Sequence, residues 1–222
     1  MKISFITMLF CMLSNFISPA KPSNFHSIFE SKKSEVSDYC SLFTNLQLYK
    51  FGLSEQGFDN AVNGFISRAS SGLFKRPNIL TIIDFTIPST RNRMFVIDLM
   101  NGKLLFQTLV AHGVGSGFII PTRFSNKPGS LQSSPGFYST ADIYTGKNGL
   151  SLKLNGLETG INDMASSRAI VLHGANYVSS SFVKLHGYLG RSWGCPAVSK
   201  EILPDIIETI KGGTCMYLYA GK

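Results

Sequence analysis

The sequence is poor in charged residues and in cysteine, and these shortages limit the functions it can have. Only 15% of the 222 residues are charged, and no stripe of Lys and Arg is interleaved with aromatic side chains. Such a stripe is the usual footprint of nucleic-acid binding, so no nucleic-acid partner is expected. The 4 cysteines and 4 histidines form no Cys-x-x-Cys or His-x-x-x-His pair, so no zinc site is predicted. No internal repeat is present.

Acidic residues are also fewer than basic ones. The 13 Asp and Glu stand against 21 Lys and Arg, which leaves a net charge of +8 at pH 7. A basic balance suits an anionic setting such as a cell wall or lipid head groups, and it also serves plain solubility. Composition leaves both interpretations open.

The N-terminus has the pattern of a secretory signal peptide. Met1-Lys2 is positively charged, residues 3–13 are apolar, and Ser18-Pro19-Ala20 places small residues before a cleavage point. A membrane anchor is the alternative, but the apolar run is shorter than the roughly 20 residues that span a bilayer. We therefore predict that residues 1–20 are a signal peptide and that the mature protein is exported.

The cysteine count then indicates a free thiol. Three cysteines remain after cleavage, Cys40, Cys195 and Cys215, and an odd number in an exported protein leaves at least one unpaired. Cys195 is the candidate for that thiol. Cys40 and Cys215 can pair with each other, or Cys215 can be a small buried side chain in an apolar strand, and spacing alone decides neither.

The mature chain is predicted to contain one main domain. Residues 21–75 are assigned to a flexible leader and a helical segment, and residues 76–222 to the main domain. The clearest helix starts after Ser54, which can cap it, and ends near Gly72. Its apolar residues recur at helical spacing: Phe58, Ala61, Val62, Phe65, Ile66 and Ala69.

The main domain shows many short strands separated by turns. Asn101-Gly102 and Asn148-Gly149 are strong hairpin signals. Residues 169–172 are expected to form a short strand that leads to His173, and residues 200–211 a helix. The other predicted strands cover residues 79–85, 94–99, 103–111, 150–154 and 214–219. This pattern predicts a mainly β fold, a mostly antiparallel sandwich or barrel.

Cys195 and His173 are the strongest chemical signal in the sequence. The cysteine lies in Arg191-Ser192-Trp193-Gly194-Cys195-Pro196-Ala197-Val198, and the histidine in the earlier Val171-Leu172-His173-Gly174. A thiol is a strong nucleophile only as a thiolate, and a neighbouring imidazole can take its proton. We expect His173 to act as the general base and to lower the pKa of the Cys195 thiol. The cluster predicts a cysteine-dependent acyl-transfer site.

The motif resembles the L,D-transpeptidase (YkuD-type) family, in which an early His-Gly or His-Ser is followed by Ser/Thr-x-Gly-Cys. It is closest to the branch of murein L,D-transpeptidase catalytic domain proteins, and the resemblance covers about residues 53–219. Further matching segments are Pro77-Asn78-Ile79-Leu80, Ser125-Asn126-Lys127-Pro128, Ser134-Pro135-Gly136-Phe137-Tyr138 and Gly160-Ile161-Asn162-Asp163. Three features depart from the wider family: a longer interval between His173 and Cys195, Trp193 in place of a histidine, and Pro196-Ala197 in place of a hydrophobic-Arg/Asn pair.

The resemblance implies a fold and an activity. The fold would be an L,D-transpeptidase-like β-sandwich or barrel with a few helices and an N-terminal helical segment. The Cys195 thiolate would form a thioester with a tetrapeptide stem of peptidoglycan, and an amine on a second stem would resolve it into a cross-link. The partners would be peptidoglycan stem peptides in the periplasm or cell wall, and no cofactor, metal or protein partner is implied.

The resemblance also implies roles for the residues around the reacting pair. The main-chain N–H groups of Trp193, Gly194 and Cys195 would form an oxyanion hole. Ser192 would steady the loop by hydrogen bonding, and a main-chain carbonyl would orient His173. The side chain of Trp193 has two open interpretations, as a wall of the cleft or as part of the core.

Four further residues are candidates for substrate contact. Arg191 and Arg168 can meet stem carboxylates, because a guanidinium fork suits them, or they can be structural. Gly174 is expected to open into the cleft and Tyr138 to reach it. His186 lies between the two motif segments and is interpreted as a loop residue.

Other outcomes remain open. Water in place of the acceptor amine would make the protein an L,D-carboxypeptidase that trims tetrapeptide stems. A non-catalytic wall-binding module is a further alternative, although binding alone needs neither His173 nor Cys195. A papain-like peptidase is not expected, because in that family the cysteine precedes the histidine in the sequence.

Overall fold

The computed structural model describes Tyr39 and residues 41–221. The predicted signal peptide, the predicted flexible leader and Cys40 lie outside the described residues. Among the helices of the described part, none is long and apolar enough to cross a membrane.

The predicted helix is confirmed. The 3-10 helix η1 (Leu48–Phe51) leads into α2 (Glu55–Ala69). The Ser54 side chain caps α2 by accepting a hydrogen bond from the Gly57 N–H group (3.1 Å), which satisfies one of the free donors of the first turn. The helix ends at Ala69, three residues before the Gly72 that was expected to close it.

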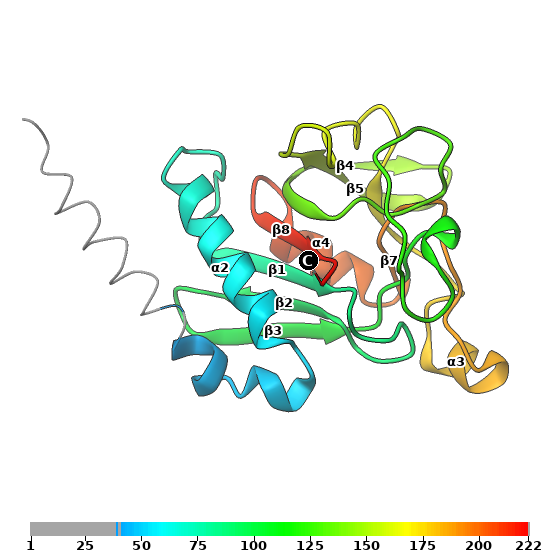
Figure 1. Cartoon of the computed structure of the whole chain (residues 1–222), viewed down its shortest axis with the longest axis horizontal. Helices are drawn as coiled ribbons and strands as arrows, with labels where there is room; N and C mark the ends of the chain where they lie inside the picture. Colours follow the sequence, from blue (N-terminus) through cyan, green and yellow to red (C-terminus); the bar gives the residue numbers. More distant parts are fainter. Residues whose placement is uncertain (1–38, 40, 222) are drawn as a thin grey trace, which may run out of the picture.

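The apolar stripe of α2 is buried against the sheet. Phe58 and its helical neighbours share one core with Leu80 and Ile82, which point to the same face of their strand. In Figure 1, α2 lies across this face of the sheet. The helix is therefore packed into the same body as the main domain rather than attached through a linker.

A single sheet of eight strands organises the described part of the chain. Its spatial order is β3-β2-β1-β8-β4-β5-β6-β7, with parallel pairing in β1/β8 and β6/β7 and antiparallel pairing elsewhere. The strands are β1 (Ile79–Asp84), β2 (Met94–Asp98), β3 (Lys103–Thr108), β4 (Gly136–Gly146), β5 (Gly149–Gly156), β6 (Val171–Gly174), β7 (Ala197–Val198) and β8 (Cys215–Tyr219). The predicted mainly β, mostly antiparallel fold is confirmed.

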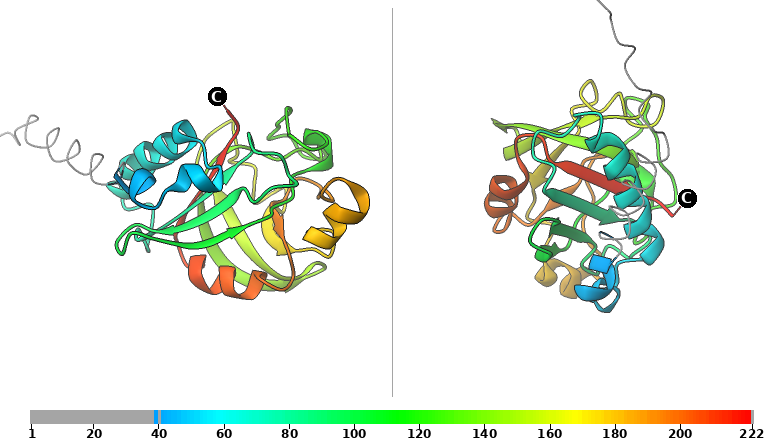
Figure 2. Two further views of the ribbon diagram at one scale, coloured as in Figure 1. Left: turned by 90° about the horizontal axis from the view of Figure 1, so that it is seen from below. Right: turned by 90° about the vertical axis from the view of Figure 1, so that its left-hand side faces the viewer.

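The sheet curls until its two edges meet. The chain leaving β3, at one edge, forms an antiparallel bridge between Ala111 and Ala197 of β7, at the other edge. Ala111 N–H donates to the Ala197 carbonyl at 2.7 Å. This seam makes the sheet barrel-like, and Figure 2 shows the curvature from two sides.

A second core fills the side of the sheet opposite α2. There α4 (Leu203–Ile210) buries Ile206 and Ile207 against Leu172 of β6 and Met216 of β8. Figure 2 shows α2 and α4 on opposite sides of the strands. The helix predicted over residues 200–211 is confirmed, and it packs behind the strand that carries His173.

Among the elements that were not predicted, β4 and α3 are the longest. The long strand β4 carries Ser, Thr and Gly, and its outer half is exposed, so it lacks a clear alternation. The short helix α3 (Ser180–His186) buries no side chain and is fixed by its caps, Ser179 and Gly187. His186 is therefore the last residue of a helix, and its interpretation as a loop residue is wrong.

Cys215 is a free thiol in the middle of the structure. Its side chain has no exposed surface and lies in the α2 core. Of the two interpretations left open by the sequence, the small buried side chain is the one confirmed.

Candidate active site

The loop that carries Cys195 is fastened to the segment that follows β3. Ser192 N–H donates to the His112 carbonyl (2.9 Å), and Val114 N–H donates to the Ser192 carbonyl (2.8 Å). Both segments extend directly from the seam between Ala111 and Ala197. Closure of the sheet therefore sets the position of the loop.

A tight turn around Gly194 presents the cysteine. The Ser192 hydroxyl donates to the Cys195 carbonyl (2.6 Å) and accepts from Gly194 N–H (3.1 Å). Gly194 has φ +128°, and a Cβ placed there would lie 2.8 Å from the Gln132 carbonyl oxygen. Only glycine fits this position, because both the backbone conformation and the space forbid a side chain.

A fully buried serine supports this turn from beneath. The Ser133 hydroxyl donates to the Gly194 carbonyl (3.0 Å) and accepts from Gly113 N–H (3.0 Å). Its own N–H donates to the Ser116 hydroxyl (2.9 Å). Since each of these groups is buried, losing one partner would leave another unsatisfied, and the network holds the loop in one conformation.

A buried Arg93–His112 pair lies behind the same segment. Arg93 can only donate, so its Nη2 contact of 2.7 Å makes His112 Nδ1 an acceptor, and Nε2–H is left to donate to the Gly117 carbonyl (3.3 Å). The other Arg93 donors bind the carbonyls of Val110 and Ile87. Burial, helped by the positive charge of Arg93, lowers the pKa of His112 to about 4. The imidazole is therefore neutral at physiological pH.

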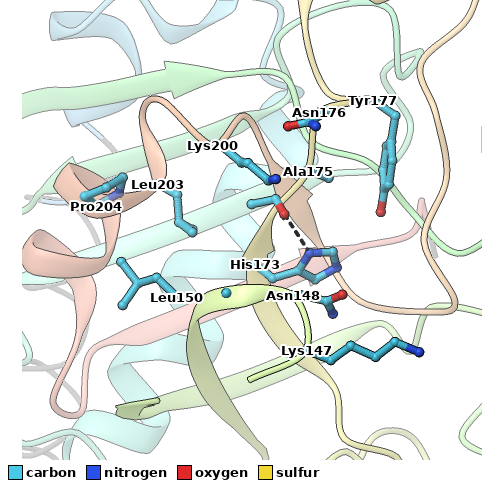
Figure 3. Close-up of a pocket in the computed structure, with 12 residues that line it drawn as sticks. Lys147, Asn148, Leu150, His173, Ala175, Asn176, Tyr177, Lys200, Leu203 and Pro204 are labelled. Atoms are coloured by element: carbon cyan, nitrogen blue, oxygen red, sulfur yellow. Dashed lines mark hydrogen bonds between the residues drawn. The ribbon is translucent and has the colours of Figure 1, made fainter. Parts of the chain in front are cut away.

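His173 is held by strands on both sides. It lies on β6, opposite Ser151 of β5 and Ala197 of β7, and only 5% of its surface is exposed. Nδ1 lies 3.2 Å from the Gly174 carbonyl oxygen (Figure 3). A carbonyl can only accept, so Nδ1 carries the proton and Nε2 keeps its lone pair. Burial lowers the pKa of His173, which favours this neutral form.

The Cys195 thiol is neutral in the resting structure as well. Sγ donates to the Ala169 carbonyl oxygen at 3.6 Å. Burial raises the pKa of the thiol and outweighs the opposite effect of the nearby Arg168 charge. The prediction that His173 lowers this pKa is wrong for the resting protein, because a neutral, buried imidazole offers the thiolate no positive charge.

Ala169, whose carbonyl accepts the hydrogen bond from the thiol, has an unusual backbone. Ala169 has φ +53°, a left-handed conformation that side chains other than glycine adopt at a cost of about 1–3 kcal/mol. It forms the elbow before β6, where its N–H donates to the Ser166 carbonyl (3.0 Å). This elbow directs the Ala169 carbonyl toward Sγ.

Cys195 and His173 line one cavity of about 420 Å³. His173 also lines an adjoining cavity of about 600 Å³ that Cys195 does not line. The residues common to both are Lys147, Asn148, His173 and Tyr177. Figure 3 shows the imidazole of His173 between the turn that carries Lys147 and Asn148 and the ring of Tyr177. A molecule can thus approach the reacting pair from two directions.

The charge of both cavities is basic. Lys147, Arg168 and Arg191 line the smaller one and Lys200 the larger one, and no Asp or Glu is among the described residues lining either. The described residues also contain no group of three or more His, Cys, Asp or Glu placed to hold a metal ion. The arrangement suits an anionic ligand and a nucleophile–base pair.

The two arginines predicted to bind substrate carry structural contacts. The terminal nitrogens of Arg168 donate hydrogen bonds to the loop before β4. The acceptors are Ser125 O (2.7 Å), Ser134 Oγ (2.5 Å), Ser130 Oγ (3.2 Å) and Gln132 O (2.6 Å). Arg191 donates from one nitrogen to the Gly117 carbonyl (3.1 Å). Both line the cavity with Cys195, but Arg191 keeps more donors free for a ligand.

Three other predicted residues occupy different environments. Gly174 lines the larger cavity, and a Cβ there would lie 2.9 Å from Lys200 Cγ. Trp193 lines the smaller cavity but is 77% exposed, which excludes its interpretation as a core residue. Tyr138 has no exposed surface, and its hydroxyl donates to the Ser134 carbonyl (2.9 Å). The prediction that Tyr138 reaches the cleft is wrong, because its side of β4 faces the core.

The proposed oxyanion donors differ in availability. Gly194 N–H is already bound to the Ser192 hydroxyl. Within the described part of the chain, the N–H groups of Trp193 and Cys195 donate to no other residue. Two of the three expected donors are therefore free for a ligand oxygen.

Several residues of the site were missed from the sequence. Asn148 was recognised as part of a hairpin turn, but not as a cavity wall beside His173. Tyr177 and Ala169 carry no motif that would have indicated them. Ser133 and His112 support the cysteine loop through buried hydrogen bonds, and no local sequence pattern predicts such bonds.

One family model matches most of the chain. A family model described as "L,D-transpeptidase catalytic domain" matches residues 50–219. No curated protein sequence matches the chain significantly. An L,D-transpeptidase from Mycobacterium smegmatis is 13% identical, with a TM-score of 0.39 over 64% of this chain and 59% of that one. The helical cell shape determining protein Pgp2 from Campylobacter jejuni is 12% identical, with a TM-score of 0.42 over 65% of this chain and 48% of that one. The chain thus spans less than two thirds of the length of either protein.

Proposed function

The chain belongs to the L,D-transpeptidase catalytic domain family, and from this premise we propose that it is a cysteine-dependent acyltransferase that cross-links peptidoglycan stem peptides. The observation that carries the proposal is the shared cavity, which is lined by the Cys195 thiol and by an imidazole whose Nε2 lone pair is free. A binding module would need neither group. The predicted signal peptide would bring the protein to this substrate in the periplasm or cell wall.

The first step transfers an acyl group to sulfur. Cys195 Sγ attacks the carbonyl carbon of the third stem residue while His173 Nε2 takes the thiol proton. The carbonyl oxygen becomes an oxyanion that the free N–H groups of Trp193 and Cys195 can stabilise. The C–N bond to the terminal D-amino acid then breaks, and His173 returns the proton to the leaving amine. The product is a thioester on Cys195.

Because both groups are neutral at rest, the proton moves during the attack and not before it. Burial that raises the thiol pKa and lowers the imidazole pKa disfavours a resting thiolate–imidazolium pair. When the proton leaves Sγ, the hydrogen bond from the thiol to the Ala169 carbonyl is lost. Substrate entry must therefore turn the thiol toward His173. General-base catalysis of this kind contributes about 10²–10⁴-fold to a rate.

The second step passes the acyl group to an amine. The acceptor nitrogen attacks the thioester carbon, His173 takes its proton, and the thiolate leaves and recovers that proton. The adjoining cavity, which His173 also lines, offers the acceptor a separate approach. The basic lining formed by Lys147, Arg191 and Lys200 favours the carboxylates that stem peptides carry.

One observation favours the carboxypeptidase as a second candidate. Trp193 lines the cavity that contains Cys195, but it is 77% exposed, so this wall of the cavity is open to water. If water reaches the thioester before an amine, the enzyme trims tetrapeptides to tripeptides. The two outcomes share every residue and differ only in the acceptor.

The test is a reaction of the purified protein with disaccharide-tetrapeptide, analysed by chromatography and mass spectrometry. We expect dimers joined by a 3→3 linkage together with free D-amino acid. Tripeptide without dimers would assign the carboxypeptidase. Unchanged substrate, with sacculus binding retained, would assign the non-catalytic module. Cys195→Ser is the matched control and should give no product.

A further inference from the structure

The chain between His173 and Cys195, together with Phe118, builds an aromatic surface that the proposed chemistry does not use. This interval, longer than is usual in the family, contains α3 and the segment that returns to the cysteine loop. No side chain of α3 is buried, and Leu185 and His186 are exposed. Figure 1 shows α3 at the edge of the molecule, far from α2. Of the α3 side chains, Val183 packs against a small core cluster, so the ring contacts of the others need another explanation.

Four rings form this surface, which we call the aromatic platform: Phe118, Phe182, His186 and Tyr188. Phe118 and Tyr188 lie 4.8 Å apart between ring centroids, and Phe182 and His186 lie 4.2 Å apart. Tyr188 connects the two pairs, at 6.0 Å from Phe182 and 5.9 Å from His186. Phe118 is 50% exposed. The rings therefore hold one another in place, with Phe118 and His186 exposed and Phe182 and Tyr188 half-buried.

The platform is continuous with the reaction cavity. The Arg191 guanidinium lies 4.9 Å from the centre of the Phe118 ring, and it also lines the cavity that contains Cys195. Its hydrogen bond to the Gly117 carbonyl fixes this bridge. A long ligand whose reacting end occupies the cavity can therefore continue past Arg191 onto the rings.

The chemistry of the platform favours a sugar over other occupants. In the described part of the chain, neither the Tyr188 hydroxyl nor the His186 ring nitrogens form a hydrogen bond. A saccharide presents C–H faces to aromatic rings and hydroxyl groups to free polar atoms, so it would use both features. A peptide strand would need an open sheet edge, and the nearby edge at Ala197 is already bridged to Ala111. A lipid chain would leave the polar atoms unpaired.

We propose that the aromatic platform binds the glycan strand that carries the stem peptide, next to the bond that Cys195 attacks. The inference rests on the proposed function, because that function places a glycan-linked stem in the cavity. The rings would add affinity for substrate without touching the reacting atoms. Their loss should therefore raise KM for glycan-linked donors and leave kcat unchanged.

Two donor substrates separate this role from a general effect. Disaccharide-tetrapeptide and the same tetrapeptide without sugar are compared with wild type, Phe118→Leu and Tyr188→Leu. Removing a well-packed aromatic contact typically lowers the affinity for a ligand about tenfold. We expect the ratio of the two KM values, with and without sugar, to shift about tenfold in both variants. Leu185→Ser is the control, since Leu185 is 79% exposed on the same helix but outside the ring contacts.

A second measurement keeps the inference testable if the proposed function fails. Binding of stem-free glycan oligosaccharides is measured by calorimetry with wild type, Phe118→Leu and Leu185→Ser. Weaker binding in Phe118→Leu alone supports the platform even where no turnover occurs with either donor. Equal binding by all three proteins, or an equal KM change for both donors, overturns it. Binding to phospholipid vesicles that Phe118→Leu loses, without any sugar effect, would assign the surface to a membrane and also overturn it.

Discussion

Replacing His112 by glutamine should remove part of the protein's sensitivity to acid. The imidazole is fully buried, accepts from Arg93 and donates to the Gly117 carbonyl. A second proton would destroy the acceptor and place two positive charges side by side. Glutamine offers one acceptor and donors on the same terminal group, and it does not titrate.

The magnitude follows from the pKa of His112, lowered from 6.5 in the unfolded chain to about 4 in the fold. A depressed histidine pKa means that the unfolded state binds the proton first as pH falls. The stabilising contribution is therefore complete above pH 6.5 and is lost on the way down to about pH 4. Each pH unit in this window costs about 1.4 kcal/mol, so the total is about 3 kcal/mol.

Urea unfolding at pH 7.5, 6.0, 5.0 and 4.5 measures this effect. The wild type should lose about 2–3 kcal/mol more than His112→Gln between the highest and lowest pH. Other titrating groups, His173 included, are common to both proteins and cancel in the comparison. His186→Gln is the control, because His186 is exposed, and it should follow the wild type. The same pH dependence in His112→Gln and the wild type would refute the buried neutral imidazole.

Three further predictions concern the cysteines and the histidines. Cys195→Ser should abolish product formation without a change in melting temperature, whereas Cys215→Ser should keep activity and lose about 1–3 kcal/mol of stability in urea unfolding, because it buries a hydroxyl group. His173→Ala should lower the steady-state rate about 10²–10⁴-fold and His186→Ala should leave it near wild type; the opposite result would reassign the base. Since burial lowers the pKa of His173, the acid limb of kcat/KM should lie below pH 6.5, and a limb above that value would contradict a neutral resting imidazole.

The features predicted correctly from the sequence are those with a local cause. The β4–β5 turn lies where Asn148-Gly149 predicted it, at Lys147-Asn148, and Gly149 supplies the positive φ of 77° that closes the hairpin. Ser54 caps α2 because its side chain reaches the third residue onward. His173 lies at the end of a buried strand because an apolar, β-branched run precedes it.

The features that were missed depend on tertiary contacts. The sequence around Tyr138 on β4 does not indicate which face of the strand is buried. The register of β4 against β8 determines that the Tyr138 side chain points inward. The helix α3 has no buried stripe, so no periodicity indicated it. The raised pKa of the Cys195 thiol comes from burial by segments remote in sequence, which outweighs the chemistry that the motif alone suggests.

The most direct test of the central claim is to trap the acyl-enzyme. The protein is mixed with disaccharide-tetrapeptide, quenched in acid within milliseconds to seconds, digested and analysed by mass spectrometry. We predict a disaccharide-tripeptide acyl group on the peptide that contains Cys195, formed with loss of one D-amino acid and absent from Cys195→Ser. Product formation with no acyl group on Cys195, or an acyl group on any other residue, would contradict the account.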